Sequence, residues 1–166
     1  MSDHLPTYLN DHLAGSTAGL ELARRAAGSN EGTELGTLLS RFASEFEGER
    51  SSLKSVIEAV GSHPNPAKVA AAWVGEKAGR LKPNDQLTGY SALSRMVELE
   101  GLSIGIEGKR LLWRALAERT DPRLTSFDFT ALAEQAQRQR DELEPFRLAA
   151  AASAFDADAQ GAPATA

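Results

Sequence analysis

Apolar residues recur with the spacing of an α-helix along long segments of this 166-residue chain. Side chains three and four positions apart lie on one side of a helix, so each segment predicts a helix with one buried face. No segment shows the strict alternation that is typical of a half-buried strand. The pattern predicts an all-α protein, and the length suits a single domain. The predicted long helices cover about residues 5–27, 33–60, 90–118 and 127–155.

The connections between these segments predict a bundle with one crossover. "GSN" at 28–30 and "RTDPRLTS" at 119–126 are short, so the helices that each joins should be antiparallel neighbours. The middle connection is long. It contains "GSHPNP" at 61–66, where Asn65 and Pro66 favour the start of a short helix to about residue 80. A short crossover helix between the second and third long helices is typical of a ferritin-like bundle.

Two features concern the C-terminal part of the chain. Pro145 lies inside the last predicted helix, where a missing backbone N–H predicts a kink or a local break. Residues 156–166 contain no large apolar side chain, so they are expected to form a disordered tail. The predicted organisation is therefore a helical bundle over residues 1–155 followed by a tail at 156–166.

Two stretches resemble the ferritin-like superfamily, including uncharacterised bacterial proteins of the rubrerythrin type. They are "YLNDHLAGSTAGLELARR" at 8–25 and "SRMVELEGLSIGIEGKRLLWRAL" at 94–116, and the resemblance covers about residues 5–152. It implies a ferritin-like four-helix bundle. The di-iron centres of that family take a glutamate from each of two helices and Glu-x-x-His from each of the other two. Here the positions three after Glu49, Glu134 and Glu142 are serine, glutamine and proline. The resemblance therefore implies the scaffold without the di-iron site.

Polar residues interrupt the apolar stripes near the middle of each long helix. Plotted at about 100° per residue, Glu100 and Glu107 fall among apolar residues of the third long helix. Glu49 likewise falls among apolar residues of the second long helix. The stripes also include Ser16, with His12 at its flank, and Gln139, with Gln135 and Arg140 at its edges. Helices of similar length would bring these groups to one level, so we expect a polar layer inside the bundle.

This layer has two interpretations. Glu49, Glu100 and Glu107 could hold a divalent metal such as Fe or Mn, with His12 or water completing the coordination. Alternatively, the layer is a buried network of hydrogen bonds and ion pairs, with Arg140 or Arg50 as the cation. The missing histidines favour the second interpretation.

Glycines are unusually frequent in two of the predicted helices. Each costs about 1 kcal/mol relative to alanine inside a helix, so a compensating role is expected. We predict that the first and third long helices touch along them, because a missing side chain lets two backbones approach. The alternatives are a local bulge or room left for a ligand. The glycines are Gly15 and Gly19 in one helix and Gly101, Gly105 and Gly108 in the other.

The third long helix also has a second apolar side. Either the short crossover helix, which contains Trp73, covers this side, or a homodimer buries it. We expect a homodimer. The residues of this second side are Leu99, Leu102, Ile106, Trp113 and Leu116.

Composition restricts the function classes. The net charge of −5 and the absence of a basic cluster argue against nucleic acid and anionic membranes as partners. The chain has no cysteine, no signal-peptide pattern and no long apolar run, so a cytoplasmic protein is expected. No phosphate-binding loop or Ser-His-Asp set is present. The sequence therefore predicts a non-catalytic structural or interaction module that needs no cofactor. The alternative is an enzyme or metal-storage protein that binds Fe or Mn.

Overall fold

The computed structural model describes residues 4–64 and 90–160, and the side chains up to 156. Within these ranges the chain forms four long helices and one 3-10 turn, and no strand. The all-α prediction is confirmed, and each predicted long segment contains one helix. The elements are α1 (Leu5–Ser29), α2 (Glu34–Ala59), α4 (Ala92–Ala117), η1 (Pro122–Leu124) and α5 (Phe129–Gln160).

Local sequence explains where several helices begin and end. Thr33 precedes α2, and its side chain accepts a hydrogen bond from the backbone N–H of Gly36 at 3.0 Å. Ser91 caps α4 in the same way, because its hydroxyl accepts from the N–H of Ser94 at 3.0 Å. These contacts satisfy N–H groups that the first turn of a helix leaves unpaired. Gly61, with a φ of 79°, follows the end of α2 in a conformation that favours glycine.

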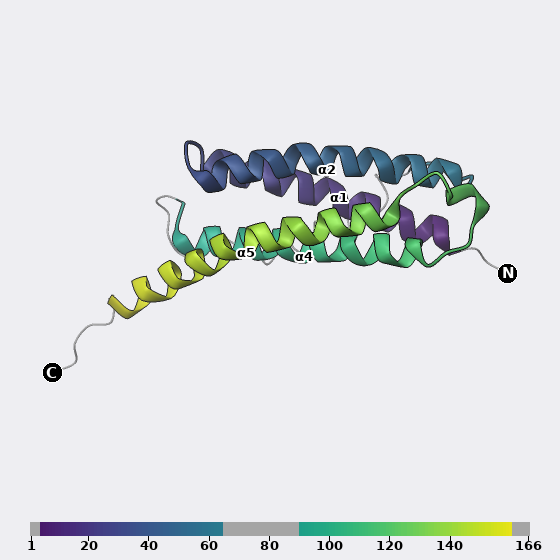
Figure 1. The fold of residues 1–166 in the computed structure, drawn as a ribbon. Coiled ribbons are helices and arrows are strands. Elements are labelled where there is room, and N and C mark those ends of the chain that lie inside the picture. Colours follow the sequence, from purple (N-terminus) through teal and green to yellow (C-terminus); the bar gives the residue numbers. More distant parts are fainter. Residues whose placement is uncertain (1–3, 65–89, 161–166) are drawn as a thin grey trace.

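The helices form two antiparallel hairpins, α1–α2 and α4–α5, that pack side by side (Figure 1). α1 contacts α4, and α2 contacts α5. At one end Asn30 Nδ2 donates to the Tyr90 hydroxyl just before α4 at 3.0 Å. At the other end Arg123 Nη1 donates to the Val60 carbonyl just after α2 at 2.9 Å. α2 therefore ends and α4 begins at opposite ends of the bundle, so the two helices run in the same direction. The predicted crossover helix at 66–80 lies outside the described residues.

The apolar core consists of two clusters, one toward each end of the bundle. One contains Phe42 and Phe46, whose rings stack with centroids 5.9 Å apart, together with parts of all four long helices. The other contains Trp113, which stacks on Phe129 at 6.1 Å. Glu49 lies between them in sequence, after Phe46 and before Leu53, so the expected polar layer separates two apolar clusters.

α4 buries a different face from the one predicted. Leu99, Leu102, Ile106, Trp113 and Leu116 are each at most 2% exposed, so the second apolar side is the core side. Ile104 and Leu111, from the stripe that contains Glu100 and Glu107, are 61% and 50% exposed. The expectation that a crossover helix or a second copy buries the Trp113 side is therefore wrong. Both sides of this helix are apolar, and the contacts with α1 and α5 decide which of them becomes the core.

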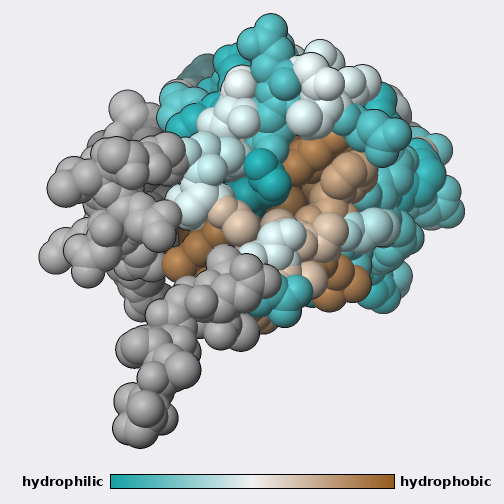
Figure 2. Space-filling model, turned by 90° about the vertical axis from the view of Figure 1, so that its left-hand side faces the viewer, coloured by the Kyte–Doolittle hydropathy of each residue, from teal (hydrophilic) through white to brown (hydrophobic). Residues whose placement is uncertain are grey.

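α5 is longer than predicted and is not broken at Pro145. It continues through Pro145 without a break and extends to Gln160, past the predicted end at 155. In Figure 1 its yellow C-terminal part runs out beyond the start of α4. Figure 2 shows this end of the molecule, where apolar side chains reach the surface among polar ones. None of the helices in the described ranges has an apolar stretch long enough to cross a membrane.

Candidate functional site: a cavity between α1 and α4

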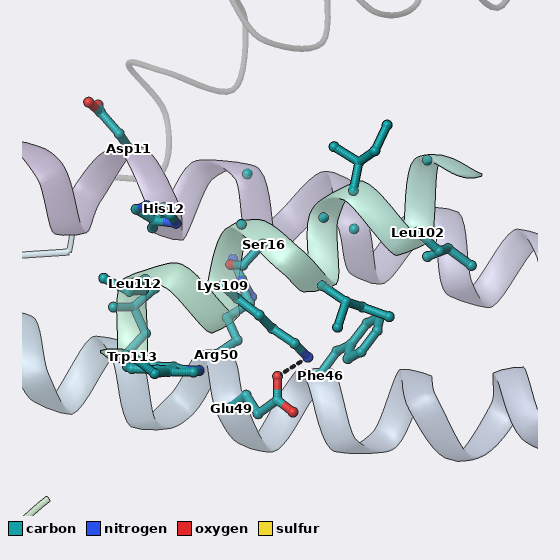
Figure 3. Close-up of a pocket in the computed structure, with 18 of the residues that line it drawn as sticks. Asp11, His12, Ser16, Phe46, Glu49, Arg50, Leu102, Lys109, Leu112 and Trp113 are labelled. Atoms are coloured by element: carbon teal, nitrogen blue, oxygen red, sulfur yellow. Dashed lines mark hydrogen bonds and ion pairs between the residues drawn. The ribbon is translucent and has the colours of Figure 1, made fainter. Parts of the chain in front are cut away.

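A cavity of about 430 Å³ lies where α1, α2 and α4 meet (Figure 3). Its volume is within the range of small-molecule binding sites, and most of its surface is apolar. The lining includes Tyr8, His12, Gly15, Ser16 and Gly19 of α1, Phe46, Glu49, Arg50 and Leu53 of α2, and Gly101, Ile104, Gly105, Gly108, Lys109 and Trp113 of α4.

The glycines of α1 and α4 form walls of this cavity. A Cβ atom placed on Gly15, Gly19, Gly105 or Gly108 would meet no atom of the described residues within 4 Å. Only at Gly101 would a neighbour be close, the Leu22 Cδ2 atom at 3.2 Å. The prediction that the two helices touch along these glycines is therefore wrong for Gly15, Gly19, Gly105 and Gly108, and α1 lies close only at Gly101. The missing side chains instead leave open space, which was the alternative interpretation.

A buried ion pair lies on the α2 side of the cavity. Glu49 is 6% exposed, and its Oε2 atom accepts a hydrogen bond from the Lys109 ammonium. Its Oε1 atom accepts from Gln139 Nε2 at 2.9 Å, and the same nitrogen donates to Glu45 Oε2 at 2.6 Å. The Lys109 ammonium also lies 3.9 Å from the centre of the Phe46 ring, in cation–π geometry. Both oxygens of the buried carboxylate are thus occupied by donors of the chain itself.

Lys109 is a site residue that the sequence interpretation missed. Burial lowers the pKa of its ammonium, and the nearby Glu49 carboxylate opposes this shift. Arg50 and Arg140 were the predicted cations for this layer. Arg140 does pair with one of its predicted glutamates, Glu107, at 2.7 Å, but neither arginine forms an ion pair with Glu49. The signal was available, because Lys109 lies seven residues after Leu102 and three after Ile106, on the face of α4 that is buried.

Two nitrogen donors in the cavity lining have no partner among the described residues. Trp113 is 2% exposed, and its Nε1 atom makes no hydrogen bond. Arg50 donates from Nη2 to the Thr17 hydroxyl at 3.0 Å, but its buried Nε atom is unpaired. Figure 3 shows the Trp113 ring extending toward Arg50. Buried polar groups are normally paired, so these two donors mark a part of the cavity that can accept a polar ligand atom.

His12 and Ser16 lie on the α1 side. The His12 ring meets Tyr8 edge to face at 4.7 Å, and burial lowers its pKa while Asp11 opposes the shift. Ser16 donates its hydroxyl proton to the Leu13 carbonyl at 2.6 Å, within its own helix. Asp11 is exposed and points away from the cavity in Figure 3. The α1 wall therefore presents a mainly neutral surface at neutral pH.

The four predicted metal ligands do not come together. Glu100 is on the outer face of α4, with its side chain 41% exposed and Arg147 Nη1 3.5 Å from its Oε1 atom. Glu107 accepts from Arg110 and Arg140, each at 2.7 Å, and the Arg110 hydrogen bond lowers its pKa. Glu49 and His12 line the cavity separately. No three Asp, Glu or His side chains within residues 4–64 and 90–160 are grouped to hold a metal. The rotation of α4 is the reason, because it takes Glu100 and Glu107 out of the core.

A second polar cluster near the start of α4 was also missed. Glu98, rather than Glu100, is the buried acid of this helix turn, at 9% exposure. It accepts from Arg25 Nε at 3.0 Å and from the Tyr90 hydroxyl at 2.9 Å. Burial raises the pKa of Tyr90. Because Asn30 also donates to Tyr90, this cluster joins the turn of one hairpin to the start of the other and has a structural role.

Comparisons with known proteins give no further assignment. No family model matches the chain, and neither the curated proteins nor the solved structures give a match. The site itself has apolar walls, an internally neutralised ion pair and two donors that are unpaired among the described residues.

Proposed function

We propose that this chain is a ferritin-like helical bundle without a di-iron centre, and that it acts as a non-enzymatic binding module. Its ligand is a small, mainly apolar molecule held in the cavity between α1 and α4. The ferritin-like part of the proposal is supported by the parallel directions of α2 and α4, which one long crossover produces. The absence of a di-iron centre is supported by the separate partners of Glu49, Glu100 and Glu107.

The observation that carries the binding proposal is the glycine-walled cavity. Gly15, Gly19, Gly105 and Gly108 each cost a helix about 1 kcal/mol relative to alanine, about 4 kcal/mol together. That is a large part of the roughly 5–15 kcal/mol that stabilises a domain. Close helix packing does not offset this cost, because the space beside these four glycines is open. A ligand that fills the space would supply the missing contacts.

A neutral apolar dye tests this proposal. Nile red fluorescence should rise and saturate at one dye per chain with the unchanged protein. Gly105→Leu should weaken dye binding at least about tenfold, because the new side chain occupies the cavity and removes apolar surface that the dye would bury. Gly48→Leu is the matched control, since Gly48 lies in α2 with equally open space and does not line the cavity. Equal dye binding by the two leucine variants would contradict the proposal.

We also propose that the protein forms a homodimer. The supporting observation is a set of exposed apolar side chains that lie outside the core. Light scattering after size exclusion should give the mass of two chains, and replacing Leu111 and Leu148 with glutamine should give the mass of one. The exposed set is Leu93, Ile104, Leu111, Leu148 and Phe155.

A further inference from the structure

The two unpaired donors identify the polar end of the cavity. Trp113 contributes a buried indole N–H, and Arg50 contributes a buried guanidinium N–H, and neither has a partner within residues 4–64 and 90–160. The Trp113 ring is fixed by its stacking on Phe129, so its N–H cannot swing out to water without losing that contact. Each of the two groups would donate to a ligand atom that accepts hydrogen bonds.

Arg50 adds a positive charge that the cavity does not neutralise. Its guanidinium donates to the uncharged Thr17 hydroxyl and forms no ion pair with a carboxylate of the described residues. An arginine remains protonated at all ordinary pH values. In a mainly apolar cavity a charge interacts with a ligand more strongly than it does in water.

The other titratable groups of the lining do not cancel this charge. Glu49 and Lys109 neutralise each other through a direct ion pair. Asp11 is exposed at the rim and points away, and His12 packs against Tyr8 with its pKa lowered by burial. One positive charge is left inside the cavity of a chain whose net charge is −5, so the attraction is local to this site.

We propose that the ligand is an amphiphilic monocarboxylate: its carboxylate accepts hydrogen bonds from Trp113 Nε1 and Arg50 Nε, and its apolar body lies along the glycine walls. This inference rests on the proposed binding function. A single negative charge matches the single uncompensated arginine. Carboxylates with one apolar chain, such as medium-chain fatty acids, combine both properties.

Calorimetric titration with ligands of equal chain length tests the choice of head group. Decanoate should bind at least about tenfold more tightly than decanol, because a hydrogen bond to a charged group is stronger than one to a neutral group. Decyltrimethylammonium should bind more weakly than decanol, because Arg50 repels it. Arg50→Gln should reduce decanoate affinity to that for decanol, whereas Arg24→Gln, which removes an exposed arginine of α1, should change it less than about twofold.

Trp113→Phe provides a second variant, because it keeps an aromatic ring and removes the indole N–H together with part of the ring system. It should weaken decanoate binding about tenfold, because the carboxylate loses one of its two donors. In the unchanged protein the Trp113 indole proton resonance should shift on addition of decanoate. Circular dichroism of each variant checks that it is folded.

The outcomes separate this inference from the proposed function. If Nile red binds in the cavity but decanoate binds no better than decanol, the head-group inference is wrong and the binding function stands. The head-group inference is also wrong, and the binding function again stands, if Arg50→Gln and Arg24→Gln change decanoate affinity equally. If neither the dye nor any decyl compound binds, both proposals are wrong.

Discussion

Replacing Lys109 with methionine should destabilise the bundle strongly, because it leaves the Glu49 carboxylate buried without its cation. Removing one partner of a buried ion pair costs about 3–5 kcal/mol. Glu49 is 6% exposed, but the Lys109 side chain is 17% exposed and Gln139 would still donate to the carboxylate. We therefore expect a loss at the lower end of this range, about 3 kcal/mol.

Removing the Glu49 carboxylate should lower the free energy of unfolding less than removing the Lys109 ammonium does. Glu49→Leu leaves a lysine whose pKa burial already lowers, so the ammonium can lose its proton instead of remaining buried and charged. We expect the free energy of unfolding to fall by about 1–2 kcal/mol, which is the usual cost of losing buried hydrogen bonds at one site. The double variant Glu49→Leu with Lys109→Met should lie within about 1 kcal/mol of the unchanged protein, because apolar residues often replace a buried pair without loss.

Urea unfolding followed by circular dichroism at pH 7 gives the free energies for this double-mutant cycle. The matched control is the pair Arg24 and Glu47, whose side chains are 54% and 63% exposed. Its coupling energy should be under about 1 kcal/mol. A loss of less than 1 kcal/mol for Lys109→Met, or single effects that simply add in the double variant, would refute the account of a buried, coupled pair.

The remaining predictions concern pH and metals. Burial lowers the pKa of His12 below 6.5, so its contribution to stability is complete above pH 6.5 and is lost as the pH falls below that value. Between pH 7.5 and 5.5 the free energy of unfolding should therefore fall more for the unchanged protein than for His12→Gln, and equal falls would contradict this. The Asp121 carboxyl should titrate at a pKa of about 2 in a carbon-detected NMR titration, because Arg123 donates hydrogen bonds to it. Arg123→Gln should return this pKa toward 3.8. An unchanged pKa in that variant would show that Arg123 is not the cause. Mn²⁺ or EDTA should leave the melting temperature unchanged, because arginine, lysine and glutamine donors occupy the predicted ligands. A metal-dependent rise that Glu49→Gln abolishes would instead support a metal site.

The helices and hairpins could be predicted because their signals are local. Apolar periodicity and short polar connections follow directly from the sequence, and Thr33 and Ser91 are ordinary capping residues at the helix starts. Glu49 and Gln139 were also predicted to lie inside the bundle, and both are buried and joined by a hydrogen bond. On α2 and α5 the apolar face was clear enough to place them.

The orientation of α4 could not be predicted in the same way. Both of its sides are apolar, and only the contacts with α1 and α5 select the Trp113 side as the core. That choice moves Glu100 and Glu107 outward and brings Lys109 to Glu49. The glycines pose a similar problem, because a missing side chain is compatible with close packing of two helices or with open space between them. Only the distance between the helices distinguishes these two arrangements. Sequence periodicity contains no information on that separation.

Open space, and not backbone contact, lies beside Gly15, Gly19, Gly105 and Gly108 in the described part of α1 and α4. The most direct test is the free energy of unfolding of the double variant Gly19→Ala with Gly105→Ala. The account predicts a rise of about 2 kcal/mol, because two helix interiors gain alanine and neither new methyl group meets a neighbour. Gly36→Ala is the steric comparison and should destabilise the protein, because its methyl group would overlap the Asn30 carbonyl. A fall in stability for the double variant would mean that the two helices touch there, and would contradict the cavity.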